Sequence, residues 1–204
     1  LFYELNEQED AIFNRTIALV SQQFTYARYT PLLYYKGKID QLEAQSQRNM
    51  GRFMKILLVK RLESSFFAFR NSIDRFIRSY ELFIAEFEKG HVYLSKKYTQ
   101  KIFEMLEQDD DEAVQRLLDE GKAERLNSHD FRDDFLPDLR RDLAILQEVQ
   151  ALWQQVDRDP KLLALLDKLK QNKLLRENKL ILFTESKETA VYLTTHINHA
   201  HPNQ

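Results

Sequence analysis

Basic side chains that could contact phosphate groups are concentrated between residues 48 and 78. Eight lysines and arginines stand there against two acidic residues, a net charge of +6 in a chain whose overall charge is −2. Lys60, Arg61 and Arg70 flank the apolar face of the helix expected in this stretch, so we expect them near its edges. Cationic groups in that position would contact nucleic-acid phosphates and lose affinity as the salt concentration rises.

An acidic stretch offers an alternative explanation for these charges. Residues 104–134 contain twelve acidic and four basic residues, a net charge of −8. Surfaces of opposite charge attract each other, so the basic side chains would then pair with the acidic helices or simply keep a bundle in solution. Charge alone slightly favours this second explanation and leaves both open.

The sequence does not indicate other kinds of ligand-binding or catalytic chemistry. It contains no Gly-x4-Gly-Lys-Ser/Thr loop for nucleotide phosphates and no His-Glu-x-x-His zinc motif. It has no cysteine, which excludes disulfides and cysteine-based zinc sites. His196, His199 and His201 are expected on a terminal helix and tail, where exposure is commoner than metal binding. We therefore predict no catalytic residue, no metal site and no cofactor within the chain.

One stretch of helix should dominate the fold. Within residues 38–89, apolar side chains alternate steps of four and three, at Leu62, Phe66, Phe69, Ile73, Phe76, Tyr80, Phe83 and Phe87. This period of about 3.5 residues predicts one buried face on a long helix. Phenylalanine is unusual in a two-stranded coiled coil, so we expect the helix to pack across several neighbours. Gly51 is expected to weaken or kink it, and Gly90 to end it.

A first helix is expected before this one, and the two define the fold class. Asn6 and Glu9 have the spacing of a capping box, and the helix that they begin should end before Pro31. The chain has only four glycines and four prolines, too few for the turns of an all-β domain. We predict a mainly α fold, a helical bundle built on one long aromatic-seamed helix.

Shorter elements are expected after Gly90. Apolar spacing predicts helices near residues 95–106 and 112–120, and a longer helix over residues 136–156 that could lie antiparallel to the aromatic face. Asp159 and Pro160 have the arrangement of an N-cap followed by a first-turn proline, so a further helix should begin there.

The C-terminal residues have a different pattern. Leu180–Phe183 form a continuous apolar run of strand length, typical of a strand buried in a parallel sheet, and a helix should follow over the next residues. This is half of a β-α-β unit, a short C-terminal strand-helix fragment of an α/β lobe. Because a lone strand is not stable, residues 180–184 should pair with a second copy of the chain or pack irregularly.

Two passages resemble the region between the RecA-like lobes of bacterial Swi/Snf-like superfamily-two helicases. The first is residues 52–70, which include Arg61-Leu62-Glu63-Ser64-Ser65. The second is Asp159-Pro160-Lys161-Leu162, followed by residues 179–189. The resemblance extends in order over nearly the whole chain, except that residues 90–158 look like an insertion.

The resemblance implies an organisation and a function for a longer parent protein. Residues 1–178 would form the helical inter-lobe region, and residues 179–204 would be the start of the second RecA-like lobe. The parent would bind ATP and Mg²⁺ between its lobes and move along double-stranded DNA, with the missing helicase lobes as partners of this chain. Thr184 has the motif position of a nucleic-acid contact, although Ser186 stands where relatives often carry an aromatic residue.

Three functional hypotheses follow. The chain would be a helical connector between motor lobes with a basic face near DNA, a protein-interaction module that does not bind nucleic acid, or an independent helical enzyme. The last would need a cleft with perturbed titratable groups, and the sequence offers none that can be named. The longest apolar runs are too short to span a bilayer, and the absence of cysteine agrees with a cytoplasmic protein.

Overall fold

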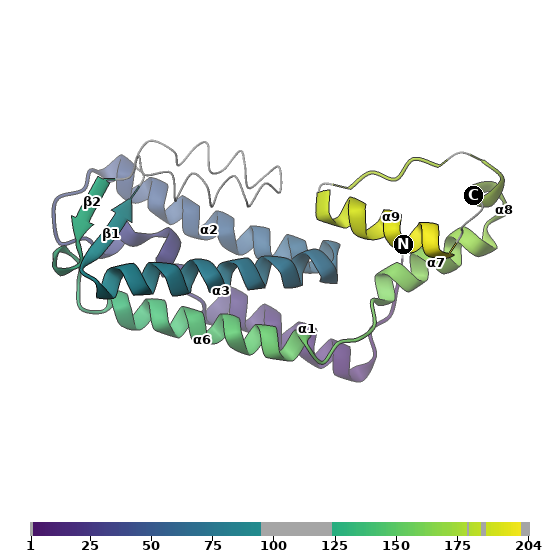
Figure 1. The fold of residues 1–204 in the computed structure, drawn as a ribbon, viewed down its shortest axis with the longest axis horizontal. Helices are drawn as coiled ribbons and strands as arrows, with labels where there is room; N and C mark the ends of the chain where they lie inside the picture. The colour runs from purple at the N-terminus through teal and green to yellow at the C-terminus, as the bar shows by residue number, and fades with distance from the viewer. Residues whose placement is uncertain (1, 95–123, 179, 185–186, 201–204) are drawn as a thin grey trace.

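The computed structural model describes residues 2–94, 124–178, 180–184 and 187–200. This described part is mainly α-helical, as predicted, and its strands form one two-stranded antiparallel sheet. Figure 1 shows a bundle of long helices with a smaller group of C-terminal helices at one end.

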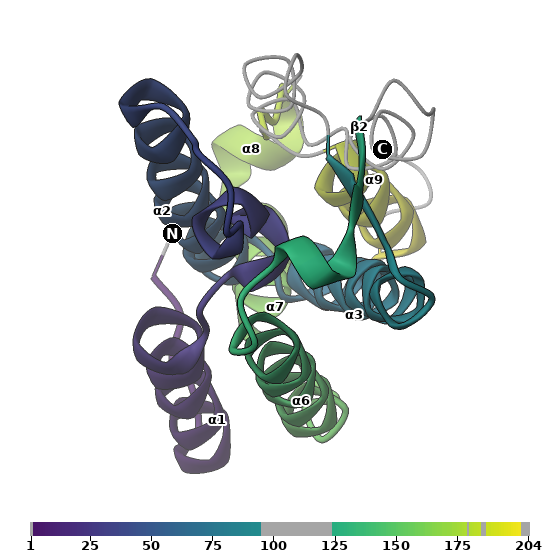
Figure 2. The ribbon, with the colours of Figure 1, turned by 90° about the vertical axis from the view of Figure 1, so that its left-hand side faces the viewer.

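The bundle consists of α1 (Glu7–Ala18), α2 (Gln41–Ser64), α3 (Phe66–Glu88) and α6 (Phe135–Trp153). In the end-on view of Figure 2 these four helices surround an irregular N-terminal segment. That segment consists of a π-helix, η1 (Leu19–Gln23), and two 3-10 turns, η2 (Ala27–Tyr29) and η3 (Pro31–Tyr34). Its buried residues, which include Leu19, fill the space between the helices.

The single helix predicted within residues 38–89 is two helices, so this expectation was wrong. Ser65 has an extended backbone (φ −154°, ψ 125°) and separates α2 from α3, which run in opposite directions and converge at this residue (Figure 1). The Ser65 hydroxyl accepts a hydrogen bond from the backbone N–H of Ala68 at 3.3 Å, as a serine N-cap does. Gly51, where a kink was expected, lies within the continuous helix α2.

The aromatic face is buried, as predicted. Phe66, Phe69, Phe76 and Phe83 all lie in the core along α3, and α6 runs antiparallel to them. Ring contacts hold α3 and α6 together at both ends. The ring centroids of Phe66 and Trp153 are 4.6 Å apart at one end, and those of Phe87 and Phe135 are 5.4 Å apart at the other. α6 lies inside the range 90–158 that was predicted as an insertion, and its inner face nevertheless belongs to the main core.

Both predicted helix starts that depend on capping are confirmed. The Asn6 side chain accepts from Glu9 N at 2.8 Å, and the Glu9 carboxylate accepts from Asn6 N at 2.9 Å. Asp159 accepts from Leu162 N at 2.9 Å and begins α7 (Pro160–Gln171). The first helix ends before Pro31, as predicted, because α1 passes into η1 and the 3-10 turns.

The strand that follows α3 belongs to a two-stranded antiparallel sheet that the sequence did not predict. Gly90 ends α3 with φ 92°, a left-handed conformation that glycine adopts without strain. The strands β1 (His91–Leu94) and β2 (Glu124–Asn127) pair antiparallel, with His91 opposite Asn127. A 3-10 turn, η4 (Ser128–Asp130), leads from β2 toward α6. The helices predicted over residues 95–106 and 112–120 lie outside the described residues.

The C-terminal group contains α7, α8 (Lys173–Glu177) and α9 (Lys187–Ala200). The strand predicted over Leu180–Phe183 is not formed: these residues are irregular and exposed, which is one of the two outcomes expected for a strand without a sheet. None of the described helices combines the length and the hydropathy that crossing a bilayer requires.

Candidate functional site

The four residues predicted to contact nucleic acid lie in different settings. Lys60 is exposed on α2, whereas Arg61, one residue later, is only 6% exposed and donates a hydrogen bond to the Ser72 hydroxyl on α3. Arg70 is half-buried on α3 and donates to the backbone carbonyl of Val156. Thr184 lies in the exposed irregular segment before α9. The structure does not bring these four residues together.

The basic residues between positions 48 and 78 divide into two groups. Four of them donate to acceptors within the fold: Lys55 to the Ser21 carbonyl at 2.6 Å, Arg75 to the Glu188 carboxylate, and Arg61 and Arg70 as above. The other four are exposed and make no hydrogen bond or ion pair within the described chain: Arg48, Arg52, Lys60 and Arg78. The first group stabilises the fold, and the second is available to a partner.

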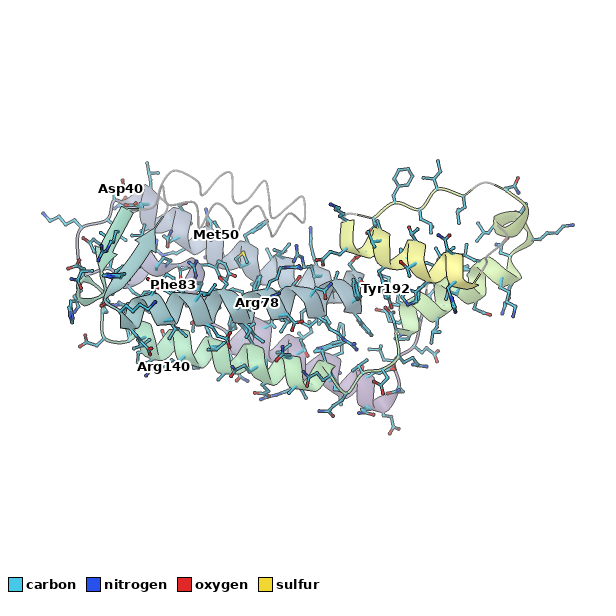
Figure 3. The ribbon with its side chains drawn as sticks, viewed as in Figure 1. Asp40, Met50, Arg78, Phe83, Arg140 and Tyr192 are labelled. Atoms are coloured by element: carbon cyan, nitrogen blue, oxygen red, sulfur yellow. The ribbon has the colours of Figure 1, made fainter. Side chains whose placement is uncertain are left out.

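Three residues of the available group lie on the outward face of α2. Arg48, Arg52 and Lys60 are separated by four and eight residues, so they follow one another along the solvent side of the helix. Met50, Met54 and Leu58 hold the opposite face of α2 in the core. Figure 3 labels Met50 on α2 and Arg78 on the neighbouring helix α3. The spacing of these three residues is visible in the sequence. Only the helix break at Ser65 shows which basic residues face solvent and which are bonded within the fold.

A second cluster joins α9 to the bundle. Arg75 on α3 donates to the Glu188 carboxylate at the start of α9, with Nη1 and Oε1 2.5 Å apart. One helical turn further along α9, Tyr192 stacks on Phe67 of α3, with ring centroids 4.7 Å apart and planes within 7° of parallel. Figure 3 shows Tyr192 near the first turn of α3. These contacts fix α9 against the helix that follows the Arg61–Ser65 block.

Tyr192 also contacts the start of α7. Its hydroxyl donates to Asp159 Oδ2 at 3.2 Å, so the residue that caps α7 also binds α9. Burial and the neighbouring Asp159 carboxylate together raise the pKa of Tyr192 to about 12, so its hydroxyl stays protonated and remains a donor at neutral pH. α3, α7 and α9 therefore meet at this one tyrosine.

A cavity of about 450 Å³ lies beside these contacts, lined among others by Phe66, Phe67, Arg70, Leu162 and Tyr192. Its walls are largely apolar, and the side chains of Arg158, Asp157, Asp159 and His196 add mixed charge at its edge. No group of three or more His, Cys, Asp or Glu side chains suited to a metal ion occurs among the described residues. Of the three C-terminal histidines, His201 lies outside that part of the chain.

The most buried charged residue in the described part of the chain, Asp142, was not predicted from the sequence. Asp142 on α6 is 0% exposed and accepts four hydrogen bonds: from Thr25 N, from the Thr25 hydroxyl, from Ala27 N and from the Tyr80 hydroxyl. Burial raises the pKa of Asp142, and the four donors oppose that effect. Oδ1 accepts one of these hydrogen bonds and Oδ2 accepts the other three, so this carboxylate is a structural link between α6, α3 and residues 25–27.

Comparison with known proteins gives no relative from which a function could be transferred. No protein-family model matches the chain, and neither a curated protein nor a solved structure matches it significantly.

Proposed function

We propose that this chain is the helical connector of an ATP-dependent, Swi/Snf-like DNA translocase. The observation that carries the proposal is the docking of α9 on α3 through Arg75, Glu188, Phe67 and Tyr192. In the resemblance, α9 follows the first strand of the second motor lobe, and α3 begins directly after the inter-lobe block. A contact between these two helices would link the movement of that lobe to the bundle.

The bundle has the construction that a transmitting arm requires. α3 is fixed along its length by aromatic contacts with α6, and Asp142 ties both helices to residues 25–27. Close-packed interiors of this kind transmit displacement instead of absorbing it. A rotation of α9 would therefore move α3, and with it the bundle, as one body.

The exposed residues before α9 agree with the same proposal. Ile181 and Phe183 are 74% and 92% exposed, although a run of four apolar residues normally lies inside a sheet. In a complete lobe, strands supplied by other segments of the protein would cover them. The exposure of these two residues therefore favours a partner surface that covers them. The resemblance implies that this partner is the second motor lobe.

Among the residues that the structure describes, none form a recognisable site for ATP and Mg²⁺. The sequence has no glycine-rich loop ending in Lys-Ser/Thr, and the described side chains form no acidic cluster suited to a metal ion. The proposal therefore assigns nucleotide binding and hydrolysis to other parts of the parent protein and gives this chain a mechanical role.

The test is a charge exchange at the α3–α9 contact in the full-length product of the gene that encodes this chain. Both side chains are partly exposed, at 23% and 33%, so the ion pair contributes about 1 kcal/mol, or about a fivefold shift in docking. We expect Arg75→Glu and Glu188→Arg each to lower DNA-stimulated ATP hydrolysis and translocation severalfold, and the double exchange to restore both activities.

A matched control is the same exchange at Arg15 and Glu148. This pair joins α1 to α6 at 2.7 Å and lies on the bundle surface, away from α9. Its reversal should leave the activities unchanged. The proposal is wrong if the full-length protein hydrolyses no ATP in the presence of DNA, or if reversing Arg75 has no more effect than reversing Arg15.

The exposed apolar residues also favour a second candidate, a protein-interaction module without a motor. Leu174, Ile181, Phe183 and Val191 would then bind a partner protein directly. A full-length product without ATPase activity that binds a partner through these residues would support this candidate over the connector.

A further inference from the structure

We infer that the outward face of α2 binds the phosphate backbone of duplex DNA through Arg48, Arg52 and Lys60. We call these three residues the α2 basic stripe. The inference rests on the proposed function for the class of partner, and it deepens that function by naming a contact surface. It also moves the contact away from Arg61 and Arg70, each of which donates a hydrogen bond within the fold.

The stripe is available without any rearrangement of the described chain. Its three side chains are exposed and have no acceptor among the described residues, whereas Lys55, on the same helix, is held by the Ser21 carbonyl. Unpaired guanidinium and ammonium groups keep their full capacity for phosphate oxygens. Binding there would break no hydrogen bond among the described residues.

The geometry of the stripe suits an extended, evenly charged partner. At a rise of about 1.5 Å per residue, Arg48 and Lys60 are about 18 Å apart along the helix axis, with Arg52 about 6 Å from Arg48. Duplex DNA carries one negative charge per about 1.7 Å of its axis, so about ten phosphate charges, counted over both strands, lie within this length of duplex. The stripe also winds about 120° around α2, and the long side chains of lysine and arginine can follow a curved backbone.

The residues around the stripe favour duplex over single-stranded nucleic acid. Proteins that bind single strands combine basic residues with exposed aromatic rings on which bases stack. The position that continues the four-residue spacing between Arg52 and Lys60 is Ile56, which is 54% exposed and offers no ring. The acidic residues Glu43 and Glu63 bound the stripe at its two ends and limit the contact to residues 48–60. Such a surface contacts phosphates without reading base sequence.

The test measures binding of the 204-residue chain to a short fluorescein-labelled DNA duplex by fluorescence anisotropy, over about 50 to 200 mM salt. Each phosphate contact contributes about 0.9 to the slope of log affinity against log salt, so three contacts contribute about 2.7. Over that range the affinity of the wild type should fall about 40-fold more than that of the triple variant Arg48→Gln, Arg52→Gln, Lys60→Gln.

The control is a triple variant with the same change in net charge on a different surface. Lys168→Gln, Lys170→Gln and Lys187→Gln remove three exposed lysines of α7 and α9. This variant should keep the wild-type slope, and circular dichroism should show all three proteins equally helical.

Several outcomes would overturn the inference. They are the absence of duplex binding at about 50 mM salt, an equal loss of slope in the two triple variants, and tighter stripe-dependent binding of a single strand or of polyglutamate than of the duplex. The α3–α9 exchange tests the connector independently. If the α3–α9 exchange gives the result expected for the connector but the triple stripe variant binds DNA normally, only the inference about the α2 surface is wrong.

Discussion

Replacing Asp142 by alanine should weaken the bundle more than any other single loss of a polar side chain in its described core. The carboxylate accepts hydrogen bonds from Thr25 N at 2.7 Å, from the Thr25 hydroxyl and Ala27 N at 2.9 Å, and from the Tyr80 hydroxyl at 3.0 Å. Asp142→Ala leaves all four donors without this acceptor, and two of them, Ala27 N and the Tyr80 hydroxyl, are buried. Unsatisfied buried donors carry the full cost of their lost hydration.

The size of the effect follows from two opposing contributions. Hydrogen bonds to a charged acceptor contribute about 1.5–3 kcal/mol each, so simple addition over four bonds would give about 6–12 kcal/mol. Burial raises the pKa of Asp142, which shows that the ionised carboxylate itself is costly to bury, and the alanine variant recovers that cost. We expect a net loss of about 3–5 kcal/mol, the range for breaking a buried charged network.

Urea unfolding followed by the fluorescence of Trp153 measures this loss, because Trp153 is the single tryptophan and is buried beside Phe66. At a slope of about 2 kcal/mol per molar urea, the midpoint should fall by about 2 M. Tyr80→Phe removes one donor of the four and should cost about 1 kcal/mol. The reasoning fails if Asp142→Ala costs less than about 1 kcal/mol, or if Tyr80→Phe costs as much.

Two further predictions concern pH and association. The hydrogen bond from Arg158 lowers the pKa of Glu9 in the folded protein, so its contribution to stability is present above the unfolded pKa of about 4.3 and is lost as the pH falls through the folded value. The difference in unfolding free energy between the wild type and Glu9→Gln should therefore shrink between about pH 5 and 3, and a constant difference would contradict this. If the exposed segment 180–184 pairs with a second copy, sedimentation should show a concentration-dependent dimer that Ile181→Glu with Phe183→Glu abolishes, and a monomer at all concentrations would exclude that pairing.

The features that sequence predicted well are those encoded by local spacing. The aromatic steps of three and four identified the buried face of α3. The Asn6 cap was predicted from Glu9 three residues later, and the Asp159 cap from the proline that directly follows it. Such signals need no knowledge of the neighbours. The two-stranded sheet was not predicted, because local spacing gives no sign of it. The residues of β1 and β2 that pair, such as His91 and Asn127, are far apart in sequence.

The candidate sites were predicted less well because availability depends on tertiary neighbours. Glu188 and Tyr192 are unremarkable in the sequence, and they matter because Arg75 and Phe67 lie opposite them in the fold. Asp142 is one acidic residue among many, and only the approach of Thr25, Ala27 and Tyr80 distinguishes it. A residue type and a spacing can indicate a kind of chemistry, but they cannot show which acceptors are already close.

The helix break at Ser65 shows how one residue decides which cations remain available. On a single straight helix, Arg61 and Arg70 would both lie at the edge of the aromatic face and point toward solvent. Because Ser65 reverses the chain, α3 returns alongside α2 and places Ser72 within reach of Arg61. Lys60, which lies one residue before Arg61 and about 100° around the helix, is turned away from α3 and stays exposed. The same reversal that buries one cation thus leaves its neighbour in line with Arg48 and Arg52, so the proposed phosphate-binding face of this stretch is a consequence of the reversal between α2 and α3 and not of charge density alone.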